Sequence, residues 1–273
     1  MLVGSLWVIN PLVRKLASLA YVADADRDAL STLNRRHSRF IGPHEDIVRE
    51  GDRPKGAIAI VEGWACKYRM TRDGRRRIVG FLLPGDVCDF DGSFLPEMDH
   101  SIASVTRVTV AEISQSRFEE LVISRPNLLR AFQTDRLVND AIQRAWTINV
   151  GRRSAIERLS HLLCELFFRL RRAGLASDDC FKLPLSQNDL ADALGVTVVC
   201  INRTLRQMRT SGLIELSDHT ITIPNLDVLA REGDFQTRYL HLAGEGPALA
   251  GSKAQKPSKM DGQSEMNGLR SAK

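Results

Sequence analysis

Between residues 39 and 113, short apolar or alternating runs are separated by glycine-containing turns. The turns include Glu62-Gly63, Asp73-Gly74 and Pro84-Gly85-Asp86, all of which favour sharp reversals of the chain. Short strands at regular spacing are typical of an antiparallel barrel or roll. The pattern therefore predicts a β-roll, whose clearest strands are residues 57–61, 65–70, 78–82 and 107–113.

A different pattern follows between residues 117 and 150, where apolar residues recur every three or four positions. This spacing predicts a long amphipathic helix, which we expect Gly151 to end, and Pro126 suits its first turn. The apolar stripe either packs on its own domain or forms a two-stranded dimer seam. Polar interruptions such as Asp135 and Asn139 favour the seam. The predicted dimer interface is Leu128, Phe132, Val138, Ile142 and Ala145.

A further helix is predicted over residues 155–172, and a capped helix begins after residue 185. Ser186 with Asp189 three residues later resembles a capping box, in which the hydroxyl accepts a backbone N–H that the first turn leaves unpaired. Gly195 then supplies a tight turn, and Thr197 can cap the next helix. Helix, glycine-containing turn and helix in this order predict a helix-turn-helix.

The second helix of this pair, over residues 198–209, has two unlike faces. Two alternating runs follow it around Ser217-Asp218-His219 and predict a short hairpin, the wing. A winged helix-turn-helix places its second helix in the major groove of DNA. We expect Val198, Ile201, Leu205 and Met208 to face inward, and Val199, Asn202, Arg203 and Arg206 to face outward.

The outward residues suit different kinds of contact with DNA. Arg203 can donate two hydrogen bonds to guanine, and Asn202 can read adenine or hold a phosphate. For Arg206, a solvated charge is an equal alternative. Contacts to the phosphate backbone are expected from Ser186, Gln187, Thr197 and Arg206.

Composition agrees with two modest domains. The 273 residues are 43% hydrophobic, and the net charge of +5 is a mild bias toward polyanionic partners. No run approaches the length of a membrane span, and the first nine residues do not resemble a signal peptide. The cysteines lack metal or disulfide spacing, which indicates reduced thiols in a cytoplasmic protein. They are Cys66, Cys88, Cys164, Cys180 and Cys200.

We therefore expect an α+β fold in five parts. An N-terminal segment precedes an antiparallel β-roll, a dimerisation helix, a winged helix-turn-helix and a tail with almost nothing to bury, which is expected to be disordered. The expected bounds are 1–25, 26–120, 121–150, 151–230 and 231–273.

The chain resembles the Crp/Fnr family of bacterial transcription regulators. The similarity covers roughly residues 12–227 and is strongest at Glu50-Gly51-Asp52, Asp73-Gly74-Arg75-Arg76, Leu83-Pro84-Gly85-Asp86, the long helix and residues 185–223. In that family a cyclic-nucleotide-binding β-roll precedes a dimerising helix and a winged helix-turn-helix. The resemblance implies a homodimer on an inverted repeat, with a hinge near 151–154, and it admits RNA polymerase as a partner.

The effector pocket that the resemblance implies departs from the pattern of cyclic-AMP receptors. Where those receptors carry Gly-Glu and Arg-Ser/Thr, this chain has Asp89-Phe90, with Asp91 beside them, and His100-Ser101. An anion site that lacks its arginine and gains carboxylates is unsuited to phosphate. No specific cyclic-AMP binding is expected. Gln143 and Arg144 on the long helix match the positions that lie near the adenine.

No cofactor or metal is expected. The oxygen-sensing branch of the family carries an N-terminal cysteine cluster, whereas no cysteine here precedes Cys66. Haem is a weaker alternative, and its candidate axial ligands are His44, Cys66, Cys88 and His100.

The sequence thus predicts a DNA-binding transcription regulator whose activity an unknown effector modulates at the roll. One alternative is a regulator without an effector, whose roll serves only dimerisation or protein contacts. Another is a fragment of an enzyme or channel gated by a cyclic nucleotide. We expect no enzyme, because the chain lacks P-loop, nucleophile-elbow and zinc-protease motifs.

Overall fold

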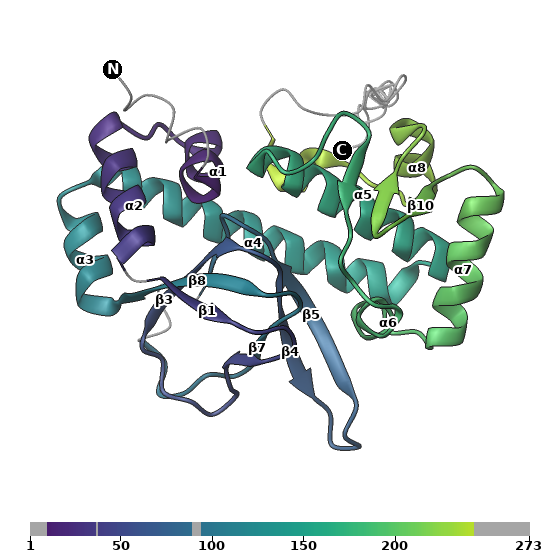
Figure 1. The fold of residues 1–273 in the computed structure, drawn as a ribbon, viewed down its shortest axis with the longest axis horizontal. Coiled ribbons are helices and arrows are strands. Elements are labelled where there is room, and N and C mark those ends of the chain that lie inside the picture. The colour runs from purple at the N-terminus through teal and green to yellow at the C-terminus, as the bar shows by residue number, and fades with distance from the viewer. Residues whose placement is uncertain (1–9, 37, 89–93, 243–273) are drawn as a thin grey trace, which may run out of the picture.

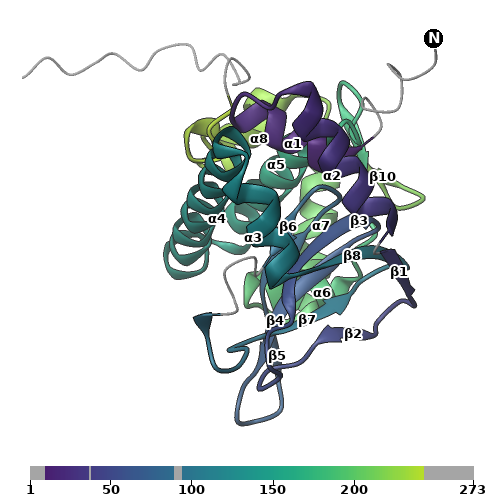
Figure 2. The same cartoon turned by 90° about the vertical axis from the view of Figure 1, so that its left-hand side faces the viewer.

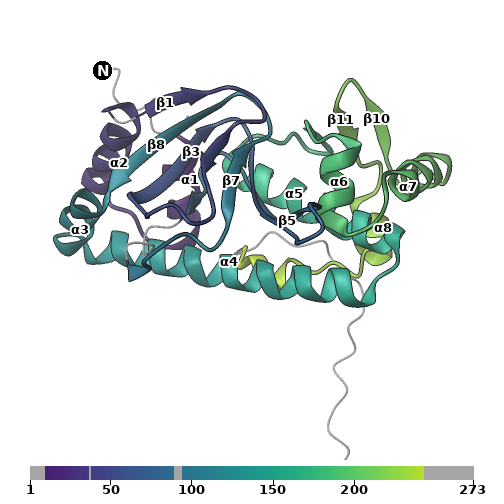
Figure 3. The same cartoon turned by 90° about the horizontal axis from the view of Figure 1, so that it is seen from below.

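A single long helix organises the molecule. The computed structural model describes residues 10–36, 38–88 and 94–242. Helix α4 (Pro126–Arg152) runs along the whole molecule, and the N-terminal roll and the C-terminal elements both lie on the same side of it (Figure 3). One face of α4 therefore carries both domains, and the opposite face is left open.

The N-terminal domain is the predicted antiparallel roll, built from two four-stranded sheets with the orders β1-β8-β3-β6 and β2-β7-β4-β5 (Figure 1). Ile58, Ile60, Ile102 and Val110 pack between the sheets. The four predicted strands are confirmed, and the two- to four-residue strands are too short for a visible alternation. The strands are β1 (Ser38–Ile41), β2 (Asp46–Val48), β3 (Gly56–Glu62), β4 (Ala65–Met70), β5 (Arg76–Leu82), β6 (Val87–Cys88), β7 (Ser101–Ser104) and β8 (Val108–Ser114).

Three helices pack against the roll: α1 (Pro11–Leu19), α2 (Asp24–Arg36) and α3 (Gln115–Ile123). Figure 2 shows α1 and α2 above the strands. Helix α1 is not among the predicted elements. Asn10 caps it, and its side-chain oxygen accepts hydrogen bonds from the backbone N–H groups of Leu12 and Val13 at 3.1 and 3.3 Å. Asn-Pro followed by buried Leu12, Val13 and Leu16 is the signal that could have revealed this helix.

The C-terminal domain is assembled around a buried helix, α5. A capping box between Ser154 and Glu157 begins α5, and the predicted wing is the β10-β11 hairpin, to which β9 adds a third strand. The fold class is therefore confirmed. The elements are α5 (Ala155–Ala173), β9 (Cys180–Lys182), α6 (Gln187–Leu194), α7 (Val198–Thr210), β10 (Glu215–Ser217), β11 (Thr220–Thr222), α8 (Leu226–Glu232) and the 3₁₀ helix η3 (Thr237–Leu240).

Two expected boundaries are wrong. Gly151 lies inside α4, which continues to Arg152, because a glycine costs a helix only about 1 kcal/mol and Ser154 fixes the actual break. The expected disordered tail begins too early. Phe235 and Leu240 are buried, and Phe235 stacks on Phe168 with ring centres 5.5 Å apart. Isolated apolar residues without periodicity gave no signal for this packing.

The predicted dimer interface is also wrong for four of its five residues. Leu128, Phe132, Val138 and Ile142 have exposed fractions of 4% or less within their own chain, and Ala145 is partly exposed. The rings of Phe132 and Phe118 of α3, for example, meet at 5.0 Å. The apolar stripe is thus the face that carries both domains.

No helix among the described residues is long and apolar enough to cross a membrane.

The buried His161 predicts a pH dependence of stability. Its Nδ1 donates to the carbonyl oxygen of Gly233 at 3.1 Å, and its ring stacks on Tyr239. Burial lowers the pKa of His161 from 6.5 to about 4. Because the pKa of His161 is lower in the folded state than in the unfolded state, the contribution of neutral His161 to stability is fully present above pH 6.5. This contribution declines as the pH falls toward 4.

Lowering the pH from 7.5 to 5.0 should therefore reduce the free energy of unfolding by about 2 kcal/mol. Urea titrations at the two pH values measure this change. The variant H161Q should lose most of the pH dependence in this range. If H161Q keeps the full dependence, another group is responsible.

Candidate DNA-binding site

The first helix of the predicted helix-turn-helix, α6, begins at the expected capping box. The Ser186 hydroxyl oxygen accepts the Asp189 backbone N–H at 3.1 Å, and an Asp189 carboxylate oxygen accepts the Ser186 backbone N–H at 3.0 Å. Burial alone would raise the pKa of Asp189, but hydrogen bonds from Ser186 and Arg76 hold it below its usual value. Gly195 ends α6 with a φ of +65°, where a side chain would be strained.

The second helix, α7, presents the predicted polar face to solvent. Thr197 caps it, and its hydroxyl oxygen accepts the Cys200 backbone N–H at 3.2 Å. Ile201, Leu205 and Met208 are buried, as expected, whereas Val198 is only partly buried. The four outward residues are all exposed, and they are Val199, Asn202, Arg203 and Arg206.

A groove of about 770 Å³ runs between α7 and the wing. It brings together Gln187 at the start of α6 and Asn202 and Arg206 of α7. Arg209, which sequence reasoning missed, also lines it. The three-residue spacing of Arg203, Arg206 and Arg209 was the available signal, because residues three apart lie on one side of a helix.

The residues of the predicted effector pocket have varied surroundings. Asp89, Phe90 and Asp91 lie outside the described residues. The Ser101 hydroxyl oxygen accepts the Glu50 backbone N–H at 2.9 Å, and His100 Nδ1 lies 2.6 Å from a carboxylate oxygen of Asp99.

Two further pocket residues lie on α4. The Gln143 side-chain amide donates to the Val79 carbonyl oxygen of β5 at 3.0 Å, and Arg144 is exposed. Ser101 therefore joins two segments of the roll, Gln143 joins α4 to it, and the effector pocket stays a prediction.

The two cysteines among the candidate haem ligands are poorly suited to iron. Cys66 and Cys88 are buried, and burial raises the pKa of Cys66 to about 12. A thiol with that pKa is protonated at neutral pH, whereas iron binds the thiolate. In the part of the chain that the structure describes, no three His, Cys, Asp or Glu residues group as a metal site.

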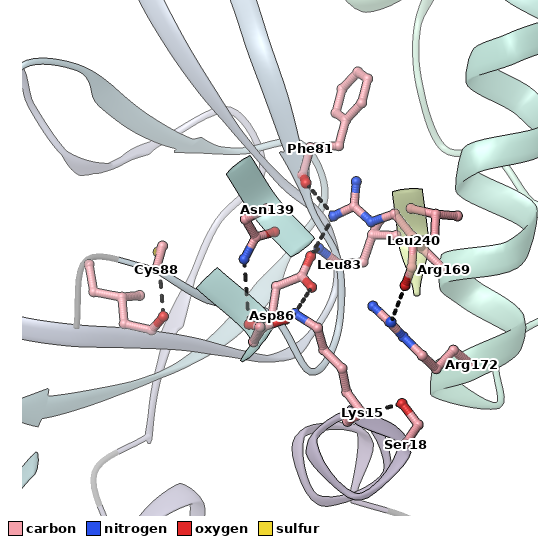
Figure 4. Close-up of polar contacts among 12 residues, drawn as sticks. Lys15, Ser18, Phe81, Leu83, Asp86, Cys88, Asn139, Arg169, Arg172 and Leu240 are labelled. Atoms are coloured by element: carbon pink, nitrogen blue, oxygen red, sulfur yellow. Dashed lines mark hydrogen bonds and ion pairs between the residues drawn. The ribbon is translucent and has the colours of Figure 1, made fainter. Parts of the chain in front are cut away.

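A buried charge network joins the roll to the DNA-binding domain (Figure 4). One oxygen of the Asp86 carboxylate lies 2.7 Å from Lys15 Nζ of α1, and the other lies 2.8 Å from Arg169 of α5. Lys15 also lies 2.6 Å from Asp135 of α4. Burial alone would raise the pKa of Asp86, but the charges of Lys15 and Arg169 hold it well below its usual value.

The network extends through α5 to the C-terminal segment. Arg169 donates to Glu165 at 3.1 Å and to the Phe81 carbonyl oxygen of β5 at 2.8 Å. Glu165 also accepts hydrogen bonds from the indole N–H of Trp146 and the hydroxyl of Tyr239, both at about 3.1 Å. Burial raises the pKa of Glu165 despite these partners. Parts of α1, the roll, α4, α5 and the C-terminal segment thus meet at one set of buried charges.

A second contact holds the helix-turn-helix to the roll. Arg76 of β5 lies 2.6 Å from a carboxylate oxygen of Asp189 and 2.7 Å from one of Asp192. Arg77 donates to the Asp192 carbonyl oxygen at 2.9 Å. The β4-β5 hairpin therefore contacts α6, whereas the exposed face of α7 stays free.

Both domains match known families. Residues 38–125 match the cyclic nucleotide-binding domain, and residues 157–232 match the Crp-like helix-turn-helix domain. The nitrogen fixation regulation protein FixK of Bradyrhizobium diazoefficiens is 32% identical over 63% of this chain and 71% of its own length. The chain belongs to the Crp/Fnr family. It is a transcription regulator with a helix-turn-helix DNA-binding domain, and its relatives are regulators rather than enzymes.

A further relative and a solved structure are also similar to this Crp/Fnr regulator. The transcriptional activatory protein AadR of Rhodopseudomonas palustris is 29% identical over 74% of this chain and 82% of its own length. The structure of FixK2 from Bradyrhizobium japonicum superposes with a TM-score of 0.63 and 25% identity, covering 71% of this chain and 95% of that one. The family resemblance predicted from sequence is confirmed.

The two adjacent arginines of the hairpin offer a matched test of the contact with α6. Arg76 bridges two aspartates of α6, whereas Arg75 is highly exposed and pairs with Asp73 of the same turn. R76Q should lower the free energy of unfolding by about 1–3 kcal/mol, because it removes charged hydrogen bonds in a partly buried contact. R75Q should leave it nearly unchanged, because its ion pair with Asp73 is exposed to solvent. Equal effects of the two variants in urea unfolding would contradict the assignment.

Proposed function

We propose that this Crp/Fnr regulator binds an inverted repeat in double-stranded DNA as a homodimer, with α7 as the reading helix. The observation that carries the proposal is the contrast between the two sides of α7, one of which is buried and the other exposed. Ile201 and Met208 are fully buried, whereas Val199 is 78% exposed on the same side as Asn202 and Arg203. An exposed apolar side chain between polar base readers suits the major groove.

Each exposed residue suits one kind of contact. Arg203 is assigned to a guanine, Asn202 to an adenine, and Val199 to the methyl group of a thymine. Arg206 and Arg209 line the groove beside the wing, where they would meet the phosphate backbone together with Gln187. The hydroxyls of Ser186 and Thr197 already cap their helices, so phosphates would bind the backbone N–H groups of the first helical turns that these caps leave unpaired.

The open face of α4 is the proposed dimer seam. Leu137 is 63% exposed and Ile148 is 55% exposed, and they lie about three helical turns apart on one side. Both side chains are exposed, and Figure 3 shows that one side of α4 carries neither domain. Two apolar residues repeated on an otherwise polar helix surface favour contact with a second α4.

We also propose that effector binding at the roll is transmitted through Asp86. This residue directly precedes β6, and β6 leads into residues 89–91, where the family resemblance puts the effector. Asp86 also binds Arg169 of α5, so a shift in that segment would reach the DNA-binding domain. The alternative is a regulator without an effector, and mass spectrometry of ligand retained by the purified protein distinguishes the two. The regulator would act in the cytoplasm with RNA polymerase as partner.

Replacing Arg203 tests the reading helix. R203A should weaken binding by about 1–3 kcal/mol per half-site and relax the preference at one base pair. Q187A should weaken binding to all sequences about equally. Selection of bound duplexes from a random pool measures both. An unchanged motif with R203A would show that Arg203 reads no base, and the absence of an inverted repeat for the wild type would reject the dimeric mode.

Charge substitutions on α4 test the dimer seam. L137D and I148D should each dissociate the dimer, because they place an unpaired charge in an apolar contact. I123D is the matched control, since Ile123 of α3 is 80% exposed and lies outside the proposed seam. Light scattering reports the molecular mass. Intact dimers for both α4 variants would sink the seam assignment.

A further inference from the structure

A cavity of about 440 Å³ lies in the roll, between β2 of one sheet and β3 and β8 of the other. The loop from Asp52 to Lys55 and the beginning of α3 complete its wall. None of its lining residues belongs to the predicted effector pocket or to the DNA-binding face. It is therefore a separate feature of the sensor domain.

The floor of the cavity is apolar. Ile47, Ile58 and Met98 line it, with exposed fractions of 8, 6 and 4%. Ile47 and Ile58 belong to the core between the two sheets, so the cavity opens directly onto that core. A volume of this size over an apolar floor is typical of small-molecule sites.

The rim carries an excess of positive charge. Arg39 is paired with Glu112 at 2.7 Å, and a carboxylate oxygen of Asp52 accepts the backbone N–H of Arg49. Three further cations line the cavity: Arg53, Lys55 and Arg117.

These three cations lack close ion pairs. Among the described residues, Arg53 and Lys55 have no carboxylate partner, and the carboxylate of Glu120 lies 3.8 Å from Arg117 on the exposed surface. Several cations without close partners around one apolar cavity are suited to an anionic ligand.

We propose that this cavity binds a small amphiphilic carboxylate. The carboxylate would bind Arg53, Lys55 and Arg117, and the apolar body would lie over Ile47, Ile58 and Met98. Arg117 belongs to α3, which packs on α4 through Phe118 and Phe132. A ligand here thus contacts an element that adjoins the proposed dimer helix.

Octanoate, octanol and octylammonium have the same chain and different charge, so they separate the contribution of the head group from that of the chain. Calorimetry on the full-length protein should show saturable octanoate binding at least ten times tighter than that of either other compound. Amide chemical-shift changes on adding octanoate should gather in β1, the β2–β3 loop and the start of α3.

The double variant R53Q/R117Q should weaken octanoate binding at least tenfold. R72Q is the matched control, because Arg72 is an exposed cation on the β4-β5 turn. The octanoate affinity of R72Q should stay within twofold of the wild type. Urea unfolding verifies that the variants remain folded. The proposal would be overturned by absent or unsaturable octanoate binding, by equal affinity for octanol, or by an unaffected double variant. Operator binding is measured separately, without octanoate.

Discussion

The fold depends on the pairing of one buried carboxylate, that of Asp86. A buried charge is tolerated only when it is paired and hydrogen-bonded, and removal of one partner typically costs about 3–5 kcal/mol. Lys15 and Arg169 both bind Asp86, so the N-terminal helix, the roll and the central helix of the DNA-binding domain must be in place together. The two domains, between which the chain has only a short helix break from α4 to α5, consequently pack as one body.

The same constraint fixes how the roll lies against the helix-turn-helix. The network lies on the side of α5 that faces the roll, and Arg76 holds α6 from the same side. The outward face of α7 is left exposed beyond both contacts. In the proposed mechanism, a signal in the roll would reach the helix-turn-helix through these contacts rather than through the outward face of α7.

Local patterns predicted what local physics decides. Apolar or alternating runs between glycine turns identified the long strands, and capping residues with a glycine turn identified the helix-turn-helix and the outward face of α7. The error on α4 has a different cause. Asp135 interrupts the apolar stripe and suggested a dimer seam, yet its partner is Lys15 of the same chain, far away in sequence. A polar residue within an apolar stripe indicates that a partner is needed, and only the tertiary structure shows which residue that partner is.

Hydrogen exchange of the wild type and of D86N tests this central claim most directly. The amide change keeps the shape of the side chain and removes its charge. If Asp86 joins the two domains, exchange should accelerate at least tenfold in β5 and in α5 together, because both lose the same support. Faster exchange confined to the roll, with α5 protected as in the wild type, would contradict it.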